Sequence, residues 1–141
     1  MARFKQLFGE PADQRVVPAQ NPSNDTNKCN QPRPAHVEVS WTGLRVAFFD
    51  LTNDGAANPT FQYWMLQPGR QDLVVPGDIH ITSPLADAKA AGYLVSGEVF
   101  TKDSNPSGDG FVVYGRAQGS ADRDVVLELT NWDHCGTNLF N

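Results

Sequence analysis

The stretch that decides the fold is residues 36–51, which read HVEVSWTGLRVAFFDL. Over its first six positions apolar and polar residues alternate, which predicts a strand with three apolar side chains on one face: Val37, Val39 and Trp41. The Thr-Gly pair at 42–43 is a tight connection to a second run, 44–51. Toward its end that run is apolar on both faces, which is typical of a strand at the centre of a sheet or against a second buried surface.

The same alternation recurs through the rest of the chain, interrupted by Gly, Pro, Asn and Asp residues that favour turns. It predicts further strands over residues 60–66, 72–75, 78–82, 93–101, 111–116 and 124–131. A short helix is predicted over 83–92, because Ser83 can cap it, Pro84 suits its first position and Gly92 can end it. We therefore expect an all-β domain of about eight strands with one short helix. The expected architecture is a two-sheet antiparallel sandwich, jelly-roll or immunoglobulin-like, with a small barrel as the alternative.

The first 35 residues follow a different pattern from the body. They hold five of the ten prolines and show no apolar periodicity longer than a few residues. Such a segment cannot bury enough apolar surface by itself to offset its ordering entropy. We expect a long extended N-terminal arm over residues 1–35, either disordered or laid along a partner, followed by a β-sandwich domain over 36–141 with an irregular C-terminal tail.

The apolar residues of this arm are the candidate anchors on a partner. The spacing i, i+3, i+4 near the start fits either one helical turn, which Gly9 and Pro11 would stop, or an extended segment. Such an arm would bind a neighbouring subunit by β-addition or by inserting side chains into grooves. The predicted partner-binding residues are Phe4, Leu7, Phe8, Val16 and Val17.

Charge and hydropathy limit the partners. Residues 1–35 carry +2 and residues 36–141 carry −7, which together give the formal net charge of −5. An acidic body argues against nucleic acid, which requires clustered Lys and Arg, and a basic arm suits an acidic neighbouring copy. The apolar runs are too short to span a bilayer, and the first residues lack the apolar core of a signal peptide. We expect a protein made in the cytoplasm, without a membrane or nucleic-acid partner, that forms homo-oligomers.

Two motifs resemble metal sites. The loop 103–110 places oxygen side chains at alternate positions with a glycine sixth, as a calcium loop does, but Tyr114 stands where such a loop needs an acid. We interpret it as a hairpin loop. The run Asp133-His134-Cys135 has no second ligand cluster, and Cys29 and Cys135 are expected as two free thiols or as one bridge. No metal, cofactor or catalytic group is predicted.

Acidic and aromatic residues of the strands are the remaining candidates for a functional site. Glu98 and Glu128 could act as a carboxylate pair on sugars, but each fits a solvated strand face better. Trp64 could form a sugar-stacking platform, because Phe61 and Tyr63 occupy the other face of its strand; most aromatics of such a domain fill the core.

The pattern as a whole favours a non-enzymatic structural protein of a larger symmetric assembly. We expect a virion component, namely a capsid, capsid-decoration or tail-associated protein, that binds other copies of itself or a capsid or tail protein through its arm. The alternative is a carbohydrate-binding β-sandwich module that uses Trp64. A small hydrolase or isomerase on a barrel would need a cluster of titratable groups, which the sequence does not supply.

Overall fold

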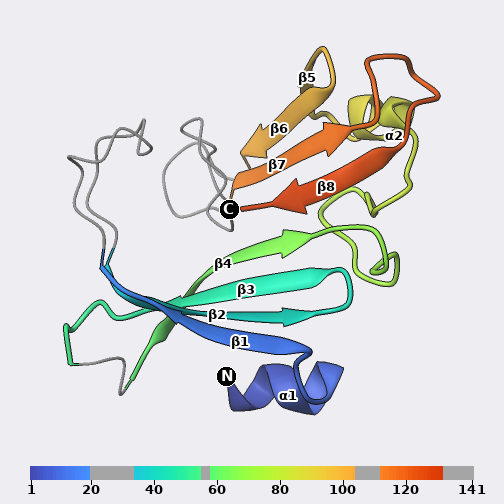
Figure 1. Ribbon diagram of the computed structural model, residues 1–141. Helices are drawn as coiled ribbons and strands as arrows, with labels where there is room; N and C mark the ends of the chain where they lie inside the picture. The colour runs from blue at the N-terminus through green and yellow to red at the C-terminus, as the bar shows by residue number, and fades with distance from the viewer. Residues whose placement is uncertain (20–33, 55–57, 104–111, 132–141) are drawn as a thin grey trace. The chain divides into compact units, whose positions relative to one another are not determined.

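The computed structural model describes residues 1–19, 34–54, 58–103 and 112–131 (Figure 1). These residues form eight antiparallel strands and two short helices, and the hydrogen-bonded strand order is β1-β2-β3-β4-β8-β7-β6-β5. The all-β prediction is confirmed as a class. The two-sheet sandwich is not confirmed, because the strands follow one another in a single sheet order. The chain divides into two compact units, whose described residues fall within 1–64 and 65–131.

The first unit is built on the predicted hairpin. Its elements are α1 (Ala2–Phe8), β1 (Asp13–Val17), β2 (His36–Trp41), β3 (Leu44–Phe49) and most of β4 (Thr60–Leu66). Strands β2 and β3 pair antiparallel with Trp41 opposite Leu44, and Gly43 in the turn has a φ of 69°. Strand β3 lies between β2 and β4 in the sheet order, which agrees with its burial on both faces.

Helix α1 packs on the apolar face of this hairpin. The ring of Phe4 lies 6.1 Å from Trp41, 5.6 Å from Phe48 and 5.2 Å from Phe61, measured between centroids. Aromatic pairs of this kind add roughly 0.5–1.5 kcal/mol each beyond the area they bury. The indole N–H of Trp41 also donates a hydrogen bond to the Gly9 carbonyl oxygen at 2.9 Å, just where the helix ends.

The extended N-terminal arm is not confirmed. Residues 2–8 are helical, as the spacing of Phe4, Leu7 and Phe8 allowed, and residues 13–17 form β1, which pairs antiparallel with β2. The composition of the segment is still too polar to fold alone. Its two phenylalanine rings pack on apolar side chains of β2–β4, and these contacts bury the apolar surface that the segment cannot bury alone. Residues 20–33 of the predicted arm lie outside the described residues.

The second unit has its own core. It contains the end of β4, α2 (Leu85–Ala90), β5 (Leu94–Ser96), β6 (Val99–Asp103), β7 (Val112–Ala117) and β8 (Val126–Thr130). Phe100 lies directly across Gly115 of the neighbouring strand, where an added Cβ would come within 2.0 Å of its ring. The glycine therefore makes room for the aromatic core residue. The other buried residues include Ile79, Ile81, Leu85, Tyr93, Val113, Val126 and Leu129.

Several predicted elements of this unit are wrong in detail. The long strand 93–101 is a hairpin of β5 and β6, because the chain turns at Gly97, whose φ is 62°. The strands 72–75 and 78–82 are absent from the structure; Val75 and Ile79 form one isolated bridge around a tight turn. The helix predicted over 83–92 is present as α2, but Ser83 does not cap it, because its hydroxyl accepts a hydrogen bond from the His80 N–H at 3.0 Å.

Candidate functional site

Strand β1 is the first feature of the candidate site. It stands at one end of the sheet order, so within the described ranges β2 pairs with one of its edges and no strand pairs with the other. Four of its five residues are exposed, and the side chain of Val16 is 70% exposed. An open strand edge presents unpaired N–H and C=O groups that can pair with another chain.

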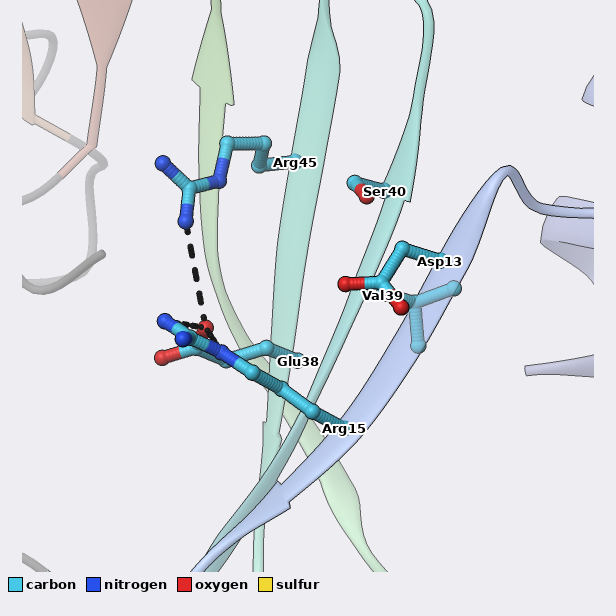
Figure 2. A pocket seen from close by; sticks show the side chains of 6 residues that line it. All are labelled: Asp13, Arg15, Glu38, Val39, Ser40 and Arg45. Carbon is cyan, nitrogen blue, oxygen red and sulfur yellow. Dashed lines mark hydrogen bonds and ion pairs between the residues drawn. The ribbon is translucent and has the colours of Figure 1, made fainter. Parts of the chain in front are cut away.

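An ion cluster joins β1 to β2, and Figure 2 shows its Arg15, Glu38 and Arg45 side chains. Glu38 is buried and stands directly opposite Arg15 in the strand register. The Arg15 guanidinium lies 2.6 Å from one carboxylate oxygen of Glu38, and His36 Nε2 lies 3.2 Å from the other. Arg45 of β3 approaches the same carboxylate to 3.9 Å. The cluster therefore joins three neighbouring strands through one buried carboxylate.

The electrostatics of the cluster keep Glu38 ionised. Burial by itself raises the pKa of the Glu38 carboxyl, but hydrogen bonds from His36 and Arg15 and the charge of Arg15 outweigh that effect and hold the pKa below its ordinary value. Burial lowers the pKa of the Arg45 guanidinium, which the negative charge of Glu38 partly offsets. A charge-assisted bond is stronger than a neutral one, so the Arg15–Glu38 pair stabilises the register in which these two residues stand opposite each other.

A small hollow of about 100 Å³ lies beside this cluster. Figure 2 shows its lining residues, which are Asp13, Arg15, Glu38, Val39, Ser40 and Arg45. Its volume is well below the roughly 300–1,000 Å³ of a small-molecule pocket. Two carboxylates and two guanidinium groups line it, so their formal charges cancel. We interpret the hollow as a gap in the contact of β1 with β2 and β3 of the same chain, and not as a ligand pocket.

The predicted partner-binding residues fall into two groups. Phe4, Phe8 and Val17 are half-buried, and both phenylalanine rings contact Trp41 of the same chain. Leu7 and Val16 are 59% and 70% exposed. Binding by any of the five residues stays a prediction, but only Leu7 and Val16 present most of their side chain to a partner.

The other residues that the sequence suggested as sugar-binding, catalytic or metal-binding differ in their exposure, and some lie outside the described residues. Trp64 is half-buried and interacts with other residues of the chain, so it offers a sugar less of its ring than the alternation predicted. Glu98 is exposed in the turn between β5 and β6. Glu128 is buried opposite Arg116, whose guanidinium lies 4.0 Å from its carboxylate. Cys29, Cys135, Asp133, His134 and residues 104–110 of the predicted hairpin loop lie outside the described residues.

The part of the chain that the structure describes contains no group of three or more His, Cys, Asp or Glu side chains placed to hold a metal ion. It also contains no helix with the length and hydropathy needed to cross a membrane.

The ion cluster was not predicted from the sequence. The turn at 42–43 fixes the register of the hairpin, and this register places Ser40 opposite Arg45 and leaves Glu38 as a diagonal neighbour on the same face. That pair of opposite charges could have been found from the sequence. The contribution of Arg15 could not, because the sequence does not say which strand its segment joins.

No protein-family model matches this chain, and comparisons with curated proteins and with solved structures also found no match. The function is therefore argued from the residues and their geometry.

Proposed function

We propose that the protein is a non-enzymatic structural component of a larger assembly, a virion protein of the capsid, capsid-decoration or tail-associated class. Its N-terminal segment, α1 and β1, contacts neighbouring subunits. One observation carries the proposal: the same short segment has an open strand edge and exposed apolar side chains. These side chains are Val16 on β1 and Leu7 on α1.

The contacts within the chain support this role because they hold the segment in place. Phe4 and Phe8 pack against Trp41, and Arg15 is paired with the buried carboxylate of Glu38. The exposed side chains of the segment therefore stand on ordered backbone. A preorganised surface binds better, because less conformational freedom is lost when the partner arrives.

The pattern of the whole sequence supports the choice of a virion component. A Pro- and Asn-rich N-terminal stretch precedes a β-rich body, and the charge of the first 35 residues is opposite to that of the rest. This asymmetry favours attraction between copies, which an assembly of repeated subunits needs.

The test is sedimentation velocity of the full chain over a concentration series, with the double variant Leu7→Glu/Val16→Glu. Neither side chain is buried, so the fold should keep its melting temperature within a few degrees. We expect the wild-type chain to form concentration-dependent oligomers and the double variant to remain monomeric under the same conditions. The matched control is Val74→Glu, at a position 57% exposed in the second unit, which should oligomerise as the wild type does. A double variant that oligomerises like the control would contradict the proposal.

A further inference from the structure

The direction of the main-chain groups in β2 can be fixed from two hydrogen bonds. The carbonyl of Ala35 accepts from the Asp50 N–H at 2.9 Å, on the β3 side, and the carbonyl of Ser40 accepts from the Ala12 N–H at 2.8 Å, on the β1 side. Main-chain groups along a strand point to alternating sides. The even-numbered residues of β2 therefore face β1, and the odd-numbered residues face β3.

The register then gives the direction of the groups in β1. The residue pairs that face one another are Asp13–Ser40, Arg15–Glu38 and Val17–His36. Gln14 and Val16 consequently turn their N–H and C=O groups away from β2, toward the open edge. This edge has a donor and an acceptor at each of these two positions, two residues apart.

We propose that the open edge of β1 pairs antiparallel with β1 of a second copy, with Gln14 of each copy on a two-fold axis. The inference rests on the proposed function and names its first partner, a second copy of this chain. In this register the two Gln14 residues exchange both of their main-chain hydrogen bonds. Asp13 of each copy stands opposite Arg15 of the other, at the closer spacing of a pair without hydrogen bonds.

Charge selects this register over its neighbours. Moving the strands by one pair in either direction would place Asp13 opposite Asp13 or Arg15 opposite Arg15, and like charges directly opposite are destabilising. A further shift beyond the Arg15 pair would place Pro18, which has no N–H, opposite Gln14 at a position that needs one. Arg15 can serve both partners, since its side chain is 52% exposed although it is bonded to Glu38, and a guanidinium has five N–H donors.

The contact is expected to be weak when it acts alone. Strand β1 has five residues, so the dimer belongs with interfaces below about 1,200 Å², which form transient complexes. Two exposed ion pairs also make it sensitive to salt. A contact of this strength suits an assembly in which several contacts act together.

Cysteine cross-linking tests the register directly. In full-length protein with Cys29 and Cys135 replaced by Ser, Gln14→Cys would place two Cα atoms about 5.5 Å apart across the axis, within disulfide range. Val16→Cys would place its two Cα atoms roughly 14 Å apart along the strands and should not cross-link. We expect oxidised dimers of Q14C at a yield about tenfold above those of V16C and of Leu94→Cys, an exposed control on β5. Equal yields for the three variants, or a higher yield for V16C, would overturn the proposal.

Gln14→Pro and Asp13→Arg complete the test in sedimentation experiments. Proline at position 14 removes an N–H that β2 does not use, so the variant should keep the wild-type melting temperature and lose the β1 contact. D13R places Arg opposite Arg15 of the second copy and should weaken association about tenfold at low salt. Oligomers that survive Q14P and D13R, but not Leu7→Glu/Val16→Glu, would overturn the edge pairing and leave the assembly function standing. A chain that is monomeric at every concentration, with Q14C no better cross-linked than its controls, would overturn both.

Discussion

Replacement of Glu38 by glutamine is the perturbation that tests the structural account most sharply. The carboxylate is buried and accepts hydrogen bonds from Arg15 and His36, while Arg45 stands 3.9 Å away. Glutamine keeps the size of the side chain and removes its charge. The guanidinium groups of Arg15 and Arg45 then face a neutral amide. The amide has only one oxygen, so its NH2 group takes the place of a carboxylate oxygen that accepted a hydrogen bond.

The magnitude follows from the burial of each partner. A hydrogen bond to a charged group is worth roughly 1.5–3 kcal/mol, and breaking a fully buried ion pair costs roughly 3–5 kcal/mol. Arg15 is 52% exposed and Arg45 is 28% exposed, so solvent screens part of the loss. We expect Glu38→Gln to lower the free energy of unfolding by about 2 kcal/mol, which is roughly 6 °C in melting temperature for a chain of this size.

The pH dependence of the effect gives a second readout. Because the pKa of Glu38 is lowered in the folded chain, its ionisation stabilises the fold above the unfolded pKa of about 4.3, and this contribution is lost as the pH falls through the folded pKa. The difference in free energy of unfolding between wild type and E38Q should have its full value at pH 7 and should shrink below about pH 4.

The assay is thermal unfolding followed by circular dichroism at several pH values, with Glu98→Gln as the control. Glu98 is exposed in a turn, so its replacement should change stability by less than about 0.5 kcal/mol. An E38Q variant as stable as E98Q, or one whose deficit does not depend on pH, would refute the argument that the ion cluster holds β1 in place.

Three further predictions concern the second unit. Gly115→Ala should destabilise the fold by about 2–3 kcal/mol in urea unfolding, because its Cβ would come within 2.0 Å of Phe100; a loss below about 0.5 kcal/mol would show that the ring can move away. Thr82→Gly should raise the melting temperature by about 3 °C, because threonine is held there at a φ of 78° with its side chain exposed, and an unchanged or lower value would argue against strain at this position. Burial raises the pKa of Tyr93 to about 12, so the neutral phenol stabilises the fold below about pH 10 and this stability is lost between about pH 10 and 12. Tyr93→Phe should remove the ultraviolet ionisation step near pH 12, and persistence of that step would assign it to another tyrosine.

The hairpin of β2 and β3 could be predicted from sequence because every signal in it agrees. Alternation, a Thr-Gly turn and a strand apolar on both faces each indicate the same paired strands. The predictions for 72–82 and 93–101 failed where backbone geometry overrode alternation. Gly97 has a φ of 62°, so the chain turns there within a run that reads as extended. In the run 78–82 both end residues, Asp78 and Thr82, have positive φ values of 59° and 78°, which a β-strand does not have.

Strand β1 could not be predicted for a different reason. Its five residues, Asp13–Val17, include only two apolar side chains, and its contacts come from residues far along the chain. The Arg15–Glu38 pair spans 23 positions, and Phe4 contacts Phe61 across a still longer separation. Local composition indicated a segment that needs a partner surface. It could not indicate that a surface of the same chain supplies it.

The measurement that tests the proposed function most directly is quantitative peptide mass spectrometry of virus particles purified from the organism that encodes this chain. A virion component should co-sediment with intact particles in a fixed ratio to their major shell or tail protein. This association should survive repeated gradient purification. A chain found only in the soluble fraction, or one that leaves the particles in proportion to washing, would contradict the proposal that it is a structural component of the virion.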